Sequence, residues 1–263
     1  MIDYSDTTVL VTGAASGIGA ALAAQLDARS ARVICADRNE AGLAETVGSL
    51  GDDARAITCD LSDPEAAAGL VEQSFAISGR LDLICSNAGF GFGRSVMDED
   101  MNNSSAVTRL FEVNVFAGLK IAQAYCRVLS QNGQHGRLMV TASENSLSLP
   151  SAVKRSKMAF YGATKHALLI AIEWMRIDPK FADVDLHVLM PGAVYTPLIS
   201  GGLPDPAAAP AELGLIMPEQ CADTALRGMD HGLFYIPTHG HFIDDMQPRQ
   251  QEIQEAMTVL DIP

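Results

Sequence analysis

Short runs of β-branched and aliphatic residues alternate along the chain with longer, alanine-rich stretches of helical character. The runs predict strands at residues 8–12, 32–36, 54–59, 81–86, 137–141, 184–190 and 234–236. The stretches between them predict helices near residues 18–29, 39–49, 64–78, 104–131, 160–177 and 218–231. Strands that alternate with helices form βαβ units, whose right-handed crossovers cover both faces of a parallel sheet. The pattern therefore predicts an α/β fold: one Rossmann-like, doubly wound domain with a seven-stranded parallel sheet.

The chain shows no internal repeat and no linker, so residues 1–263 are expected to form one catalytic domain. Residues 200–210 are rich in glycine, proline and alanine. A mobile lid at about 196–216 fits this composition, and a disordered loop fits it equally well.

Composition narrows the function classes. Eighteen basic residues against 32 acidic ones give a net charge of −14, so the average surface repels nucleic acid and anionic membranes. The five cysteines are scattered without metal-ligand spacing, which favours reduced thiols and no metal site. The first residues lack a signal-peptide pattern, and no apolar run approaches the roughly 20 residues of a membrane helix. We therefore expect a soluble, cytoplasmic protein with a small-molecule partner.

The first predicted strand runs into a glycine-rich loop that opens a helix. Glycines in such a loop permit a tight turn, close approach of the backbone to a pyrophosphate and close packing of helix on strand. The free N–H groups of the helix N-terminus favour an anion at the same place. A strand before and a helix after are the context that the motif requires. The loop therefore predicts a dinucleotide site at Thr12, Gly13, Ser16, Gly17, Ile18 and Gly19.

Asp37 stands at the end of the second strand, close to the spacing of about 20 residues expected for a carboxylate that binds the adenosine ribose. This carboxylate would repel a 2′-phosphate, so the sequence favours NAD over NADP. The neighbouring Arg38 keeps NADP as the alternative cofactor, because a guanidinium can bind its 2′-phosphate.

Tyr161 and Lys165 lie four residues apart in a predicted helix, which puts both side chains on one face. A phenol with its ordinary pKa of about 10 is a poor base in neutral water. A nearby ammonium favours the phenolate, so we expect Lys165 to lower the pKa of Tyr161 and make it a proton-transfer group. A chance pair of this spacing would be an ordinary helix turn, but the nucleotide loop, Ser143 and Asn114 favour the catalytic interpretation.

Taken together, these residues resemble the short-chain dehydrogenase/reductase family over nearly the whole chain. The motifs that carry the resemblance are the loop 12–19, Asp60-Leu61, Asn87-Ala88-Gly89, Asn114, Ser143, Tyr161-Gly-Ala-Thr-Lys165 and Pro191-Gly192. Beyond the glycine loop, Asp37 and Arg38, the resemblance implies cofactor contacts at Asp60, Leu61, Asn87, Ala88, Gly89, Tyr161, Lys165, Pro191, Gly192, Val194 and Thr196.

The resemblance also implies a division of labour at a secondary alcohol. Hydride transfer leaves a carbonyl and a proton, so the site needs a base, a donor to the oxygen and a route for the proton. Tyr161 would be the base in oxidation and the acid in reduction, while Lys165 would lower its pKa and bind the nicotinamide ribose. Ser143 would donate to the substrate oxygen, and Asn114 would hold a water of the proton route. A non-catalytic NAD-binding sensor would be expected to lack one of the four.

The segment 144–160 is longer than is usual in the family, and both its ends adjoin catalytic residues, so we expect it to form a loop beside the substrate. Its basic residues Lys154, Arg155 and Lys157 fit contact with an anionic or oxygen-rich substrate, and they fit a solvated loop or a subunit contact equally well. The surrounding apolar and aromatic residues favour a bulky hydrophobic alcohol. The candidate substrate residues are Ser143, Leu147, Phe160, Tyr195 and Leu198.

Three shorter segments resemble bacterial Cα-dehydrogenases of lignin-derived aryl alcohols: the run from Glu144, the helix start at Tyr161, and Phe234-Tyr-Ile-Pro-Thr-His239. Hydroxysteroids and other alicyclic alcohols are competing substrates, and NADPH-dependent carbonyl reduction is the competing activity. Apolar residues on more than one face of the helices at 104–131 and 160–177 predict a homodimer or homotetramer. These residues are Ala117, Ala122, Ala163, Leu168, Ala171, Trp174 and Met175.

Overall fold

A computed structural model describes residues 2–201 and 203–262, without the side chains of residues 152, 153 and 155. Its centre is a sheet of parallel strands in the order β3-β2-β1-β4-β5-β6-β7. Their bounds are β1 (Thr8–Thr12), β2 (Arg32–Asp37), β3 (Arg55–Thr58), β4 (Leu83–Ser86), β5 (Gly136–Thr141), β6 (Val184–Met190) and β7 (Tyr235–Pro237). The predicted seven-stranded parallel sheet is therefore confirmed.

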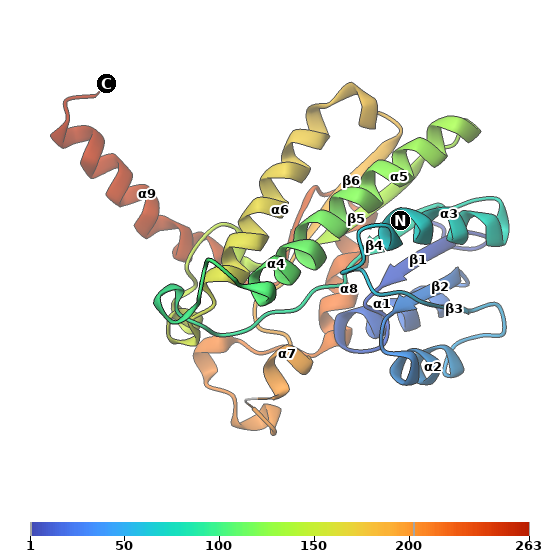
Figure 1. Ribbon diagram of the computed structural model, residues 1–263, viewed down its shortest axis with the longest axis horizontal. Coiled ribbons are helices and arrows are strands. Elements are labelled where there is room, and N and C mark those ends of the chain that lie inside the picture. The colour runs from blue at the N-terminus through green and yellow to red at the C-terminus, as the bar shows by residue number, and fades with distance from the viewer. Residues whose placement is uncertain (1, 202, 263) are drawn as a thin grey trace.

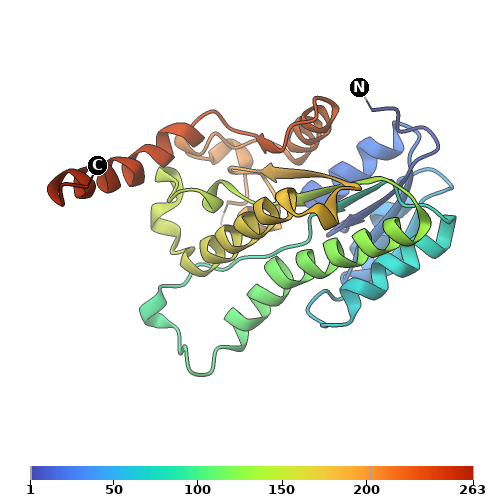
Figure 2. The same ribbon diagram turned by 90° about the horizontal axis from the view of Figure 1, so that it is seen from above.

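Helices cover both faces of the sheet (Figures 1 and 2). One layer holds α1 (Gly17–Asp27), α2 (Glu40–Gly48) and α8 (Pro218–Asp230), and the other holds α3 (Ala66–Ser78), α5 (Ala117–Asn132) and α6 (Ala159–Ile177). Each layer has its own buried apolar cluster. Along β1, Val9 and Val11 pack into the first cluster and Leu10 into the second, because successive side chains of a strand point to opposite faces.

The chain order reverses between β1 and its neighbour β4, which makes this pair the topological switch point of the sheet. In open α/β sheets, ligands bind beyond the carboxyl ends of the strands at this point. The loops that follow β1, β4 and β5 meet there and carry the predicted site residues.

The helix predicted at 104–131 is interrupted. It consists of α4 (Ser105–Phe111), a π-helical turn at Glu112–Phe116, and α5. A π-helical turn inserts an extra residue into the hydrogen-bond ladder and is frequent at functional sites. Asn114 lies inside this turn and is buried. Periodicity of apolar residues does not reveal such a turn, since the helix continues in the same direction after it.

The last helix, α9 (Phe242–Val259), has no counterpart in the sequence prediction. It extends away from the body of the protein in both views (Figures 1 and 2), and Phe242 is its one buried residue. A helix that packs on no sheet face carries no core-facing apolar stripe for sequence analysis to detect. Three short helical elements follow β6 within the predicted lid: α7 (Pro197–Ser200) and 3₁₀ turns at Pro206–Ala208 and Ala211–Leu213. Gly202 of that lid lies outside the described residues.

No helix among the described residues combines the length and the apolar character needed to cross a bilayer.

Candidate active site

The glycine-rich loop turns sharply between β1 and α1. Gly13 and Gly17 have φ of +70° and +55°, in the left-handed region that favours glycine. A Cβ on Gly19 would lie 2.0 Å from the carbonyl oxygen of Gly13, so the turn has no space for a side chain there. Ser16 caps α1 without a side-chain hydrogen bond to it. The first N–H groups of α1 are thus available to an anion.

Hydrogen bonds from Thr12 fix the segment that follows β4. Its hydroxyl oxygen accepts from the amides of Asn87 and Ala88, both at 3.0 Å, and its carbonyl accepts from the Asn87 side chain at 3.2 Å. The Thr141 hydroxyl, at the end of β5, donates to the other side of the Asn87 amide at 3.1 Å. One asparagine therefore joins the ends of β1, β4 and β5.

A small cavity of about 100 Å³ lies at the end of β2. Its lining includes the predicted residues Gly13, Asp37, Arg38, Asp60, Leu61, Ala88 and Gly89. The Asp37 carboxylate accepts from the amides of Ala15 at 3.1 Å and Asn39 at 2.9 Å, which holds it in place.

The charges of this small cavity are mixed. Asp60 accepts from the Ser62 amide, the largest cause of its lowered pKa, and pairs with Arg109 at 3.2 Å. Arg38 is exposed beside it. The structure thus brings Asp37, Asp60 and Arg38 to the lining of one small cavity.

A larger cavity of about 360 Å³ lies at the ends of β4, β5 and β6. Among the predicted residues, its lining contains Ser16, Gly17, Ile18, Asn87, Gly89, Ser143, Tyr161, Lys165, Pro191, Gly192, Val194, Thr196 and Leu198. Phe90, Gly91, Thr141, Ala142, Pro197 and Ile199 complete it. Thr141 and Gly91 carry no motif of their own. Thr141 is identified by its place at the end of β5, and Gly91 by its place in the loop after β4.

Ser143, Tyr161 and Lys165 face this larger cavity together. The Ser143 hydroxyl interacts with the Tyr161 phenol and accepts hydrogen bonds from the amide and side chain of Asn145, at 3.2 and 3.3 Å. Lys165 is buried, and its Nζ lies 5.7 Å from the centre of the Tyr161 ring. A hydroxyl donor, a phenol and an ammonium thus line one space, as proton transfer at an alcohol requires.

The prediction that Lys165 lowers the pKa of Tyr161 needs correction for the protein alone. Burial raises the pKa of the Tyr161 phenol to about 12, and the interaction with the Ser143 hydroxyl opposes this only in part. Burial also lowers the pKa of Lys165 to about 8. The cost of burying a phenolate outweighs its attraction to the Lys165 ammonium, because the ammonium donates its hydrogen bond to the Thr141 carbonyl and not to the phenol.

Asn114 does not line the larger cavity. Its side-chain oxygen accepts from the Phe90 amide at 3.0 Å, and its nitrogen donates to the Phe90 carbonyl at 2.9 Å and to Thr164 at 3.1 Å. These bonds hold the loop after β4 against α6. A Cβ on Gly89 would lie 3.2 Å from Asn114 and 3.5 Å from Lys165, so Asn114 is next to the cavity floor.

The candidate substrate residues divide into two groups. Ser143 and Leu198 line the larger cavity, whereas Leu147, Phe160 and Tyr195 are not among its lining residues. Phe160 is buried in an apolar cluster with Val107 and Leu110, Leu147 packs on the main core, and the Tyr195 hydroxyl donates to the Pro204 carbonyl. Residue spacing alone cannot tell which side of a helix or loop faces a pocket.

Two basic residues of the inserted segment, Lys154 and Lys157, are also not among the lining residues. Lys157 pairs with Asp98 at 3.5 Å on the surface, and Lys154 is exposed. The side chain of Arg155 lies outside the described residues. The solvated-loop interpretation therefore fits Lys157 better than contact with an anionic substrate.

The two cavities fit a dinucleotide. They share Gly89 and Phe90 in their linings, so one ligand can extend through both. A Cβ on Gly13 would lie 2.9 Å from the Cα of Ala88, and one on Gly17 would lie 2.9 Å from Thr196. Glycines at these positions let the backbone approach a pyrophosphate between the cavities.

Comparison with known proteins agrees with this geometry. The family model described as short chain dehydrogenase matches residues 7–203. The chain belongs to the short-chain dehydrogenase family.

Two kinds of relatives illustrate the membership. The chain is 35% identical over 238 residues to 1-deoxy-11-beta-hydroxypentalenate dehydrogenase of Streptomyces avermitilis, covering 89% of this chain and 84% of that protein. Two solved structures, each 23% identical, are similar in fold. A short-chain dehydrogenase/reductase from Burkholderia phymatum in complex with NAD has a TM-score of 0.82 over 97% of both chains. A short-chain dehydrogenase from Sphingobium yanoikuyae in complex with NADPH has a TM-score of 0.76 over 96% of this chain and 95% of that one. The chain is accordingly an oxidoreductase that uses a nicotinamide cofactor.

Proposed function

We propose that this short-chain dehydrogenase interconverts a bulky secondary alcohol and its ketone with NAD as cofactor. The observation that carries the proposal is the single cavity of about 360 Å³ that Ser143, Tyr161 and Lys165 line together with the glycine-rich loop. The groups that move a proton are thus next to the groups that hold a nucleotide.

Bound NAD would supply the hydride acceptor and a positive charge close to the phenol. In oxidation, Tyr161 takes the hydroxyl proton of the alcohol, and in reduction its phenol returns a proton to the ketone oxygen. Ser143 donates a hydrogen bond to the same oxygen, which stabilises the charge that develops there. Lys165 contributes positive charge behind the phenol and a donor to the nicotinamide ribose.

Asn114 supports the proton route by holding the loop after β4 in place. Its contacts with Phe90 fix the floor of the cavity beside Lys165. We propose that a water between Asn114 and Lys165 passes the proton onward, as the family resemblance implies.

NAD is proposed over NADP because of Asp37. Two backbone amides hold its carboxylate at the small cavity, where it would accept hydrogen bonds from the ribose and repel a 2′-phosphate. Arg38 and Arg109 in the same region favour the alternative, an NADPH-dependent carbonyl reductase.

The substrate proposal depends on the apolar side of the larger cavity. Phe90, Val194, Leu198 and Ile199 line it near Tyr161, and this suits a hydrophobic alcohol better than a sugar. The Streptomyces relative is named as a dehydrogenase of a hydroxylated compound, which is consistent with this class. Aryl alcohols of lignin type and alicyclic alcohols are the two candidates.

A panel of aryl and alicyclic secondary alcohols, tested with NAD and with NADP, examines the proposal. We expect absorbance of NADH to rise with at least one bulky alcohol, and to rise more slowly with NADP. Tight NAD binding without turnover of any alcohol or ketone would instead support the non-catalytic sensor.

A further inference from the structure

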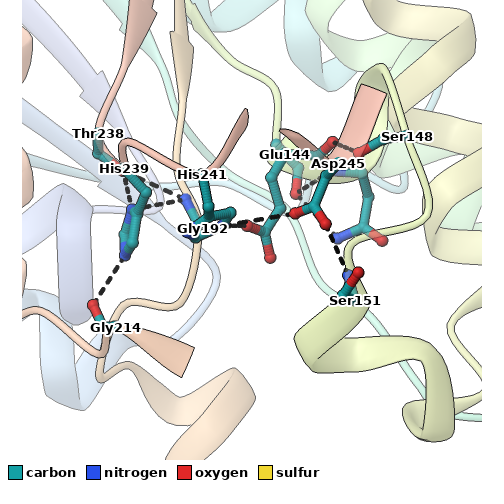
Figure 3. A network of polar contacts seen from close by, with 11 residues as sticks. Glu144, Ser148, Ser151, Gly192, Gly214, Thr238, His239, His241 and Asp245 are labelled. Carbon is teal, nitrogen blue, oxygen red and sulfur yellow. Dashed lines mark hydrogen bonds and ion pairs between the residues drawn. The ribbon is translucent and has the colours of Figure 1, made fainter. Parts of the chain in front are cut away.

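Polar residues of the segment 238–245 contact several loops around the larger cavity (Figure 3). We name this segment, from Thr238 after β7 to Asp245 in the first turn of α9, the C-terminal bridge. Thr238 and His239 belong to the segment 234–239 that carries a family resemblance, and no motif of the sequence gives the bridge residues a role. Its side chains reach the loop after β5, the loop after β6, the inserted segment and the end of the lid.

Glu144 is the first contact of the bridge. It follows Ser143 directly, its side chain is only 7% exposed, and its Oε2 lies 2.8 Å from Nε2 of His241. A buried carboxylate is costly unless a donor satisfies it, and His241 is that donor. The backbone amide of Glu144 donates to the Pro191 carbonyl at 2.8 Å. Glu144 therefore links the loop after β5, the loop after β6 and the bridge.

Gly192 is the second contact. Its amide lies 3.2 Å from the Thr238 hydroxyl oxygen and 3.3 Å from Nδ1 of His239. A Cβ at Gly192 would lie 2.7 Å from the His239 ring and 2.9 Å from Glu144, so both side chains pack closely against this glycine.

His239 extends the bridge to the lid. Its Nε2 lies 3.0 Å from the Gly214 carbonyl, and its Nδ1 lies 2.7 Å from the Thr238 hydroxyl. Burial lowers the pKa of His239, which favours the neutral ring. The tautomer with hydrogen on Nε2 satisfies all of these contacts, because Nδ1 then accepts from Thr238 and Gly192 while Nε2 donates to Gly214.

Asp245 completes the bridge. Its Oδ1 accepts from the Ser151 amide of the inserted segment at 3.0 Å, and its Oδ2 lies 3.9 Å from Nε2 of His241. The inserted segment is thus tied to the same histidine that contacts Glu144.

We propose that Glu144 and His241 form a positioning pair for the reaction. The pair holds Ser143 and Gly192, which both line the larger cavity, in a fixed relation to each other. This inference deepens the proposed function and depends on it. Contacts that serve only to attach α9 would be made to the core. These contacts are made instead to Gly192, a lining residue, and to Glu144, which directly follows the lining residue Ser143.

Replacement of His241 tests the pair. His241→Leu leaves the Glu144 carboxylate buried without its donor, whereas His241→Gln keeps an N–H donor at a similar reach. Arg249→Met is the matched control, because Arg249 of α9 donates to the Leu147 carbonyl at 2.8 Å and so attaches α9 to the same loop without touching Glu144.

The first readout is amide hydrogen exchange, which needs no substrate. We expect the Leu variant to lose protection at residues 143–147 and 191–193, and the Gln variant and Arg249→Met to retain it there. Titration with NADH should show weaker binding to the Leu variant alone. Unchanged protection and NADH affinity in a folded Leu variant would overturn the pair, whatever the substrate is.

The second readout is kinetic. With an alcohol that the wild type oxidises, the Leu variant should lose about tenfold or more in kcat, since small displacements of reacting groups are costly. The Gln variant should recover most of this loss. Equal losses in Arg249→Met would show that attachment of α9, and not the pair, matters. A wild type without turnover would refute the proposed function, while the exchange result would still decide the pair.

Discussion

The ammonium of Lys165 donates a hydrogen bond to the carbonyl oxygen of Thr141 at 2.8 Å, which joins α6 to the end of β5. Ser143 follows Thr141 by two residues, and Tyr161 precedes Lys165 by one helical turn. This one bond therefore fixes the helix that carries the phenol relative to the loop that carries the serine. It also explains why burial dominates the pKa of Tyr161, because the ammonium is directed at the strand.

The raised pKa of Tyr161 predicts that the rates of ketone reduction and alcohol oxidation depend differently on pH. With a pKa of about 12, the phenol is protonated from pH 6 to pH 7 and available as an acid throughout, and Lys165, whose pKa burial lowers to about 8, keeps its charge over the same range. Ketone reduction should then change little over this range. Alcohol oxidation needs the phenolate, so its kcat/KM should rise with pH. Initial rates at saturating cofactor measure both profiles, and a flat oxidation profile with falling reduction would mean that the phenolate already predominates.

Cofactor preference should depend on Asp37. The wild type should show a higher kcat/KM with NAD than with NADP, and Asp37→Ala should erode the preference by about tenfold, since a lost charged hydrogen-bond partner is worth roughly 1–3 kcal/mol. Steady-state kinetics with both cofactors provide the measurement. Asp53→Ala, an exposed carboxylate outside both cavities, is the control. A wild type that prefers NADP would contradict this role of Asp37 and would indicate that Arg38 holds the 2′-phosphate.

Two glycines in helices should respond oppositely to alanine. At Gly19 a Cβ would meet the Gly13 carbonyl oxygen, so Gly19→Ala should lower the free energy of unfolding by about 2 kcal/mol and weaken NAD binding. At Gly69, inside α3, a Cβ meets no atom within 4 Å. Gly69→Ala should raise the free energy of unfolding by about 0.5–1 kcal/mol. Urea unfolding of both variants checks the signs, and a harmless Gly19→Ala would contradict the geometry of the loop.

We predict assembly through the outer face of α6. Ile170, Trp174 and Ile177 are 53%, 67% and 69% exposed and follow helical spacing along one stripe. Of the residues on which the sequence prediction was based, Ala117, Ala122 and Leu168 are instead buried in the core. Light scattering should show a dimer or tetramer for the wild type and a smaller species for Trp174→Glu. Met97→Glu, at an exposed position elsewhere, should leave the mass unchanged.

The sheet and most of its helices were predictable because each strand and helix carries its own local pattern. The glycine loop and the Tyr161–Lys165 spacing are equally local, and they end up in one cavity because parallel strands bring their carboxyl ends together.

The remaining features depend on contacts between distant residues. Glu144 and His241 are 97 positions apart, and neither lies in a motif that indicates the other. The π-helical turn at Asn114 and the raised pKa of Tyr161 come from tertiary packing and burial, which spacing does not encode. The same reason explains why Phe160 was assigned to the substrate but packs with Val107 and Leu110.

Comparison of the wild type with Tyr161→Phe tests the central claim most directly. The NADH formed from a bulky secondary alcohol is measured beside the NADH dissociation constant of each protein. We predict that the variant loses about 10²–10⁴-fold in kcat and binds NADH as the wild type does, because only the phenolic oxygen is removed. Lys165→Ala should impair both quantities. A Tyr161→Phe variant that keeps most of its kcat would contradict the account.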